Sequence, residues 1–264
     1  CAVFSIVSGC FHLRAFLSVR RDLNRSFPGS PHGSLASRVA DVFLNEVVKR
    51  STHGIDLHSG ANNRTNLPHI RADLADPETE RLAQAFGTPI AINATLRDGS
   101  LRATARDLGI PILLYEAGEA LRFNPLAGRA GVRGVIGVMR ALSMLPRNRR
   151  RETPKVIEAQ ASSWVRAPRS GLLRSSVALG AHIEKGGRLG IISDAFGEQE
   201  ERVYASAQGI VIGRTNLPVV NEGDALFHVA RFSDTADVES ALDAWHQDHI
   251  EGLTADDYAE PDLS

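Results

Sequence analysis

Hydrophobic and polar positions in the first half of the chain alternate between helical and strand-like spacing. Ser34 is a suitable helix cap, and the apolar residues that follow it recur every three or four positions, as on one face of a helix. These apolar positions are Leu35, Val39, Val42, Phe43 and Val47. Residues 54–58 then predict a short strand, and Asp76 followed by Pro77 predicts the start of a second helix that reaches Gly87.

The same alternation continues along the chain. Residues 89–93 predict a strand, and Ser100 caps a helix that is predicted to end at Gly109. Residues 110–115 form a continuous apolar run, which is typical of a strand buried on both faces, and residues 131–145 predict a closing helix. Strands that alternate with helices predict an α/β fold with a mostly parallel sheet and flanking helices.

The pattern changes after an arginine-rich, polar segment at residues 147–151, which we interpret as an exposed linker. Short β-branched runs between glycine-bearing turns follow it, as in a small all-β barrel or sandwich. The sequence therefore predicts an α/β domain at residues 1–150, a small β module at residues 151–231, and an acidic tail at residues 232–264. Within this tail, residues 236–249 predict a helix.

Composition places the chain among globular proteins and excludes several partners. The chain has 264 residues, of which 43% are hydrophobic and 23% charged, and no apolar run approaches the roughly 18 residues of a membrane span. Arginine supplies 27 of the 30 basic residues, but these are mostly scattered and the net charge is −1, so we expect no nucleic-acid partner. Two cysteines exclude a disulfide framework, and the apolar start lacks the basic region of a signal peptide. We therefore expect a cytoplasmic protein.

Two polar residues at the ends of predicted strands are the first candidates for chemistry. Parallel α/β sheets bind ligands at the carboxyl ends of their strands, and His58 and Glu116 lie at such ends. A histidine in this position is more often hydrogen-bonded within the fold than functional, and Glu116 could equally form a structural ion pair. A third candidate is the polar segment at residues 20–29, where Asn24 and Arg25 could hold a carboxylate or an oxyanion, or could form a solvated turn.

Taken together, three motifs resemble the succinylglutamate desuccinylase/aspartoacylase family, which are zinc-dependent amidohydrolases related to zinc carboxypeptidases. The motifs are Asp-Leu-Asn-Arg-x-Phe-Pro-Gly at residues 22–29, Asp-Leu-His-Ser-Gly at 56–60, and Tyr-Glu-Ala-Gly-Glu at 115–119. The resemblance covers residues 20–230 in the right order, and it specifies the family more sharply than the substrate. It implies a zinc-carboxypeptidase-like α/β fold that is followed by a small β module.

The resemblance also implies roles for individual residues. His58 would be a zinc ligand, and Glu116 would be the general base that activates a zinc-bound water. Asn24 and Arg25 would bind the carboxylate end of the substrate, and Asp22 would orient a zinc-binding histidine. The implied protein binds one zinc ion and hydrolyses a small N-acyl amino acid or a related amide. A homo-oligomer is an alternative that the sequence leaves open.

The chain departs from the family at its start. The family's first two zinc ligands belong to a His-Gly-x-Glu motif upstream of the Asp-Leu-Asn-Arg segment, and residues 1–21 contain no such motif. Cys10 and His12 could be substitute ligands, but they lack a third partner. We expect this chain to bind zinc weakly or not at all, as in a truncated sequence, whereas the complete protein would be a deacylase. The alternative is a non-catalytic remnant of the same fold.

A carrier function is a third hypothesis. Residues 177–191 resemble the turn of biotinyl and lipoyl domains, in which a modified lysine lies at the tip of a hairpin. The corresponding hairpin here, residues 194–197, contains no lysine. A covalent cofactor is therefore not expected.

Overall fold

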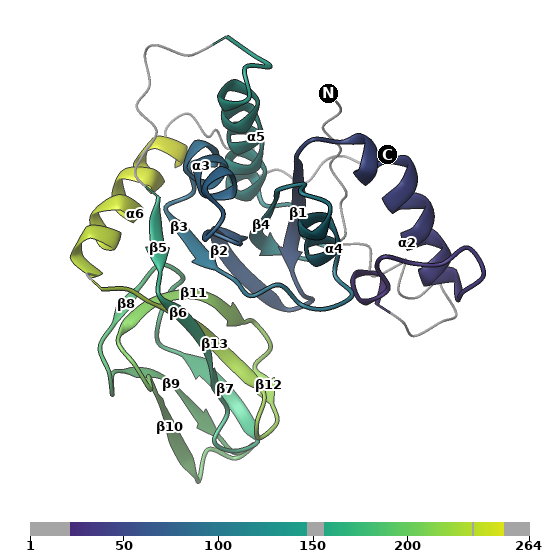
Figure 1. Ribbon diagram of the computed structural model, residues 1–264. Helices are drawn as coiled ribbons and strands as arrows, with labels where there is room; N and C mark the ends of the chain where they lie inside the picture. Colours follow the sequence, from purple (N-terminus) through teal and green to yellow (C-terminus); the bar gives the residue numbers. More distant parts are fainter. Residues whose placement is uncertain (1–21, 147–155, 234, 251–264) are drawn as a thin grey trace, which may run out of the picture.

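The computed structural model describes residues 22–146, 156–233 and 235–250 (Figure 1). Helices dominate its first half and strands its second half. In chain order the elements are η1 (Leu23–Arg25), α2 (Leu35–Glu46), η2 (Val48–Arg50), β1 (Gly54–Gly60), β2 (Arg64–Ala72), α3 (Pro77–Phe86), β3 (Ile90–Asn93), α4 (Leu101–Asp107), β4 (Ile112–Glu119), α5 (Pro125–Ala141), β5 (Ile157–Ala159), β6 (Ala161–Arg166), β7 (Gly171–Ser175), β8 (His182–Ile183), β9 (Arg188–Ser193), β10 (Glu200–Tyr204), β11 (Gly209–Thr215), β12 (Val219–Val220), β13 (Ala225–Arg231) and α6 (Thr235–Ile250).

The main sheet is mixed, so the expectation of a mostly parallel sheet is wrong. It has nine strands, with the order β1-β4-β2-β11-β13-β6 along its main path, while β3, β5 and β8 pair to its sides. The β1–β4, β2–β3 and β3–β5 pairs are parallel. The remaining pairs are antiparallel, and they form the majority.

The change of direction comes from β2, which the sequence analysis did not predict as a strand. The chain leaves β1 at Gly60, turns through Asn63 with a left-handed φ of 59°, and enters β2 at Arg64. This short turn cannot provide the long crossover that a parallel neighbour needs. Strand β2 therefore runs antiparallel to β4 and lies between β4 and the later strand β11.

The region predicted as an all-β module contains strands and no helix over described residues 156–231. These strands do not form one separate sheet. Strands β10, β9, β7 and β12 form a four-stranded sheet, whereas β11 pairs with β2 and so extends the main sheet. A separate β module and the three domain boundaries therefore stay predictions. The predicted linker at residues 147–151 lies outside the described residues.

Helix starts agree well with the sequence analysis. Ser34, Asp76 and Ser100 each accept a hydrogen bond from a backbone N–H in the first turn of α2, α3 and α4. Gly87 ends α3 with a left-handed φ of 78°. Helix α6 confirms the predicted helix in the tail, and residues 251–264 lie outside the described residues. In contrast, the closing helix begins at Pro125, not near residue 131, because Asn124 caps it.

The apolar face predicted for α2 is not the buried face. The buried residues are Ala36, Ala40 and Leu44, while Leu35, Val39 and Val42 are exposed. Small alanine side chains let the helix approach a hydrophobic cluster that includes Phe27, Leu101 and Ile110. Close backbone approach therefore outweighs the larger apolar area on the other side of the helix.

Hydrophobic clusters cover both faces of the main sheet. Helices α3 and α5 pack with Ile70, Leu113 and Tyr115 on one face, and α2 and α4 pack with Ile112 on the other (Figure 1). A third cluster lies between the two sheets of the strand-rich region. Within the described parts of the chain, no helix is long and apolar enough to cross a membrane.

Candidate active site

His58 and Glu116 lie side by side on the face of the sheet that α2 and α4 cover. Strands β1 and β4 are parallel, and His58 is the register partner of Glu116. Register partners in adjacent strands point their side chains to the same face, and Asp56 shares that face because it lies two residues before His58. The strand-end rule predicts that His58 and Glu116 lie on neighbouring strands and face one crevice, with Asn24 and Arg25 across it. The neighbouring strands and the shared face of His58 and Glu116 are confirmed.

Glu116 is a half-buried carboxylate held by one neutral donor. It follows three buried residues of β4, so the strand itself carries the side chain beneath α4. Burial raises the pKa of Glu116, and the nearby charges of His58 and Arg71 offset part of this rise. The amide Nδ2 of Asn66 donates a hydrogen bond of 3.0 Å to Oε2 of Glu116. A carboxylate with a raised pKa is suited to accept and return a proton near neutral pH.

His58 is paired with Asp56. The Nε2 atom of His58 lies 3.0 Å from Oδ2 of Asp56. Burial lowers the pKa of His58, but the Asp56 carboxylate and the charge of Glu116 outweigh burial, so the net pKa is raised. The second oxygen of Asp56, Oδ1, is buried and has no hydrogen-bond partner among the described residues.

Three arginines that sequence reasoning did not assign converge on the same site. Arg71 on β2 and Arg102 on α4 are half-buried, and both interact electrostatically with Glu116 and with Arg97. Burial lowers the pKa of both Arg71 and Arg102, with smaller contributions from the other arginines. Within the described residues none of the three pairs with a carboxylate in an ion pair. Arginines that share a site without a counter-ion favour an anionic ligand.

Asn24, Arg25 and Asp22 lie in and beside η1, and Asn24 links η1 to the start of α4. Oδ1 of Asn24 accepts a 2.9 Å hydrogen bond from the backbone N–H of Leu101, and Arg25 is exposed and bonds the carbonyl of Asn24. Oδ1 of Asp22 caps η1 by accepting from the backbone N–H of Asn24. Within the described residues, Asn24 and Arg25 form no hydrogen bond or ion pair with Glu116. Their roles in substrate binding stay predictions.

The described residues do not complete a zinc site. A catalytic zinc ion takes three protein ligands, and no group of three His, Cys, Asp or Glu side chains in the described part of the chain could hold a metal. His58 offers one imidazole, and its Nε2 already lies against Asp56. The described residues therefore supply one candidate zinc ligand, His58, and not the three that a catalytic zinc ion requires.

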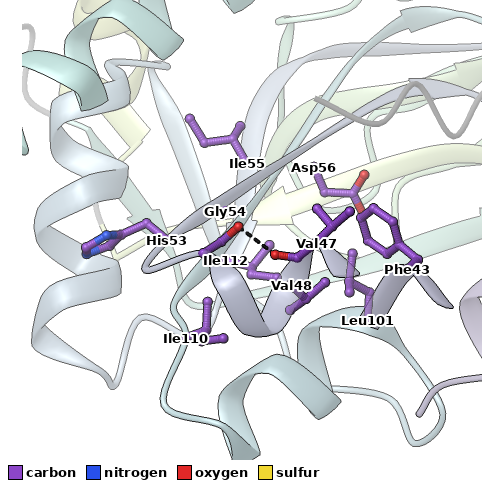
Figure 2. A pocket seen from close by; sticks show the side chains of 11 residues that line it. Phe43, Val47, Val48, His53, Gly54, Ile55, Asp56, Leu101, Ile110 and Ile112 are labelled. Carbon is purple, nitrogen blue, oxygen red and sulfur yellow. Dashed lines mark hydrogen bonds between the residues drawn. The ribbon is translucent and has the colours of Figure 1, made fainter. Parts of the chain in front are cut away.

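Three cavities border this region. A small one of about 40 Å³ lies behind Asp56, among apolar side chains of α2, β1 and β4 (Figure 2). A larger one of about 510 Å³ opens beside His58 and Glu119 and is walled mainly by apolar residues of α5. The second lies on the side of the sheet that α5 covers, and Glu116 does not line it. A third, of about 410 Å³, is lined by Arg102 and has room for a molecule as large as an acylated amino acid.

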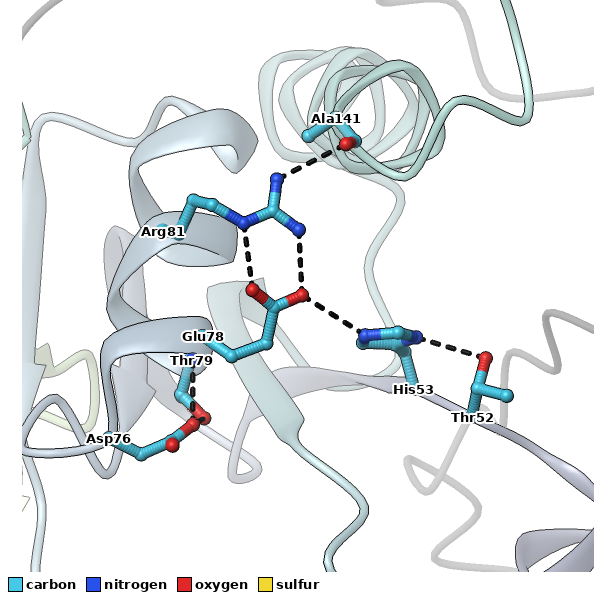
Figure 3. A network of polar contacts seen from close by, with 7 residues as sticks. All are labelled: Thr52, His53, Asp76, Glu78, Thr79, Arg81 and Ala141. Carbon is cyan, nitrogen blue, oxygen red and sulfur yellow. Dashed lines mark hydrogen bonds and ion pairs between the residues drawn. The ribbon is translucent and has the colours of Figure 1, made fainter.

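A separate polar network connects the residue that precedes β1 to helices α3 and α5 (Figure 3). Glu78 accepts two hydrogen bonds from Arg81, of 2.8 and 2.6 Å, and also lies 3.2 Å from Nε2 of His53. Arg81 donates to the carbonyl of Ala141 at the end of α5. This network joins the start of β1 to α3 and α5, and we assign it a structural role.

Comparison with known proteins decides the family. Residues 11–142, half of the chain, match the succinylglutamate desuccinylase/aspartoacylase catalytic domain. The chain belongs to this family. Both β1 and β4, with His58 and Glu116, lie within the matched residues, and the family's members are hydrolases.

Relatives within this family support the same placement. The chain is 29% identical over 226 residues to the N-alpha-acetyl-L-2,4-diaminobutyric acid deacetylase of Halomonas elongata, covering 79% of this chain and 65% of that protein. The chain thus spans slightly less than two thirds of that relative. The ectoine utilization protein EutE (DoeB) of Ruegeria pomeroyi superposes with a TM-score of 0.72 at 21% identity, over 80% of this chain and 70% of that one. A family member from Rhodobacter sphaeroides gives 0.71 at 24%, over 81% and 68%. At these identities the likeness establishes a shared fold.

Proposed function

We propose that this protein is a deacylase that hydrolyses the amide bond of a small N-acyl amino acid. The observation that carries the proposal is Glu116, a carboxylate with a raised pKa beside His58, near arginines that form no direct ion pair with a carboxylate among the described residues. A general base and an anion-binding site on one face are the two parts that hydrolysis of an acylated amino acid requires. The proposed partner is a small molecule, and the proposed compartment is the cytoplasm.

The side chains divide the proposed reaction between them. Arg102 and Arg71 bind the substrate carboxylate and so fix the amide next to Glu116. Glu116 accepts a proton from water as the water oxygen bonds to the amide carbon. The carbon–nitrogen bond then breaks, and Glu116 returns the proton to the departing amine nitrogen. The products are a carboxylic acid and a free amino acid, and Glu116 is again an ionised carboxylate that can accept a proton in the next cycle.

Zinc dependence forms part of this proposal. His58 is the candidate ligand among the described residues, and the other ligands would have to come from outside them. A bound zinc ion would supply a more acidic water and a Lewis acid for the amide oxygen.

A non-catalytic protein of the same fold is the second candidate function. The observation that favours it is the lack of a complete metal-binding group among the described residues. Such a protein would keep the arginine cluster and bind N-acyl amino acids without cleaving them.

Release of primary amine from a panel of N-acyl amino acids separates the two candidates. The purified protein, at its full natural length, is incubated with zinc and with each substrate, and binding is measured in parallel by calorimetry. A deacylase releases amine and loses this activity when a chelator is added. Binding without amine release under both conditions would favour the non-catalytic protein. A complete lack of both binding and amine release across the panel would refute the proposed function.

A further inference from the structure

Strand β11, which comes from the strand-rich second half of the chain, touches the residue that holds Glu116. Gly213 on β11 is the register partner of Asn66 on β2, and Gly213 also pairs with His228 on β13. The register of β11 shifts between Val211 and Gly213, where a bulge or irregularity interrupts the ladder. Asn66 therefore lies between Glu116 and Gly213.

Space, and not backbone conformation, explains a glycine at position 213. Its φ does not lie in the left-handed range, so other residues could adopt its backbone. A Cβ atom there would lie 3.0 Å from Oδ1 of Asn66 and 3.2 Å from Cβ of His228. His228 is buried and stacks on Trp164 with ring centroids 4.7 Å apart, so it has little room to move. The Asn66 side chain is the group that would have to yield.

We propose that Asn66 is a positioning residue for Glu116, and that the absence of a side chain at Gly213 keeps Asn66 on the carboxylate. The proposal rests on the role of Glu116 in the proposed function. It assigns the strand-rich half of the chain a part in the chemistry, although none of its residues bonds to Glu116 among the described contacts.

The hydrogen bond from Asn66 affects both the direction and the charge of Glu116. Asn66 donates to Oε2 alone, so Oε1 is the oxygen that remains to face a water molecule. A neutral N–H donor stabilises the ionised carboxylate, which opposes the effect of burial. Loss of this bond would leave a carboxylate that rotates more freely and is protonated over a wider range of pH.

A double-mutant cycle tests this coupling by kinetics. Asn66→Ala is expected to lower kcat on the order of tenfold to a hundredfold, with a much smaller change in KM, because a hydrogen bond to a charged group is lost. Gly213→Ala is expected to lower kcat by a smaller factor. In the Asn66→Ala background Gly213→Ala should have almost no further effect, because the crowded atom is absent. Phe196→Ala is the control, since Phe196 is exposed in the turn between β9 and β10 of the same strand-rich half.

NMR of the Asn66 side-chain amide tests the same geometry without activity. In the wild type, one amide proton should be shifted downfield, and both Glu116→Gln and Gly213→Ala should move this resonance, whereas Phe196→Ala should not. If neither substitution changes the chemical shift of the Asn66 amide, the proposal is wrong. Additive kinetic effects of Asn66→Ala and Gly213→Ala would also overturn it. If no variant turns over substrate but the resonance responds as expected, the proposed function fails while the positioning contact stands.

Discussion

Two buried histidines should make the protein lose stability steeply in mild acid. His69 is almost fully buried on β2, its Nδ1 lies 2.7 Å from the carbonyl of Leu67, and its Nε2 has no partner among the described residues. Burial lowers the pKa of His69 to about 4. Burial, followed by the charges of His69 and Arg71, lowers the pKa of His228 to about 3.

The size of the effect follows from proton linkage. A histidine whose pKa is lower in the folded state is neutral there while the unfolded chain takes up a proton. Its contribution to stability is therefore complete above the ordinary pKa of 6.5 and decreases as the pH falls towards the folded value. Each such group changes the unfolding free energy by about 1.4 kcal/mol per pH unit. Between pH 7 and pH 5, His69 and His228 should each remove about 2 kcal/mol, or about 4 kcal/mol together.

Urea unfolding followed by circular dichroism at pH 7 and pH 5 measures this loss. His228→Phe keeps a ring against Trp164 and removes one titrating group, so its loss between the two pH values should be about 2 kcal/mol smaller than that of the wild type. His32→Gln is the matched control, because His32 is exposed. An equal loss in His228→Phe and in the wild type would refute the reasoning.

Four further predictions concern the site and its scaffold. The pKa of Glu116 is raised in the folded state, so its contribution to stability is present below the ordinary pKa of 4.5 and is lost as the pH rises through the folded pKa. Glu116→Gln should therefore unfold at a higher temperature than the wild type at pH 8 and at the same temperature at pH 4, as measured by calorimetry. Arg102→Met should raise KM for an N-acyl amino acid on the order of tenfold to a hundredfold, whereas Arg106→Met, at an exposed position, should leave KM unchanged. Gly87→Ala should lower the unfolding free energy by about 1 to 2 kcal/mol, because the left-handed φ at the end of α3 disfavours a Cβ atom; a stability equal to wild type would contradict this. His58→Ala should lower the zinc content of the full-length protein, as measured by atomic emission, and unchanged zinc would exclude His58 as a ligand.

Helix starts could be predicted from the sequence because they depend on neighbouring residues. A side-chain oxygen at Ser34, Asp76 or Ser100 bonds an N–H only a few positions away, so the signal lies within one turn. The start of α5 was missed for a related reason. Glycines at positions 128, 131 and 134 interrupt its helical pattern early, so the apolar period becomes clear only in the second half of the helix.

Strand order and helix orientation could not be predicted in the same way. Strand β2 contains a proline and several polar side chains, and its place between β4 and β11 depends on a strand that follows more than a hundred residues later. The buried face of α2 depends on how closely the helix approaches its neighbours, which periodicity alone does not reveal. Long-range packing decided both features.

The candidate site was likewise only partly predictable from the sequence. His58 and Glu116 could be found because each lies at a strand end, where the sequence changes from apolar to polar. Arg71 and Arg102 come from β2 and α4 and meet only once the sheet has formed.

The role of Glu116 as general base is the centre of this account, and one comparison tests it most directly. Amine release from an N-acyl amino acid is measured for Glu116→Gln and for Glu119→Gln in the full-length protein with zinc supplied. Glu119 is a near neighbour on the same strand that accepts a 2.8 Å hydrogen bond from Asn216. We predict that Glu116→Gln lowers kcat by about 10²- to 10⁴-fold with bound metal unchanged, and that Glu119→Gln stays within about twofold of the wild type. Full turnover by Glu116→Gln would contradict the account.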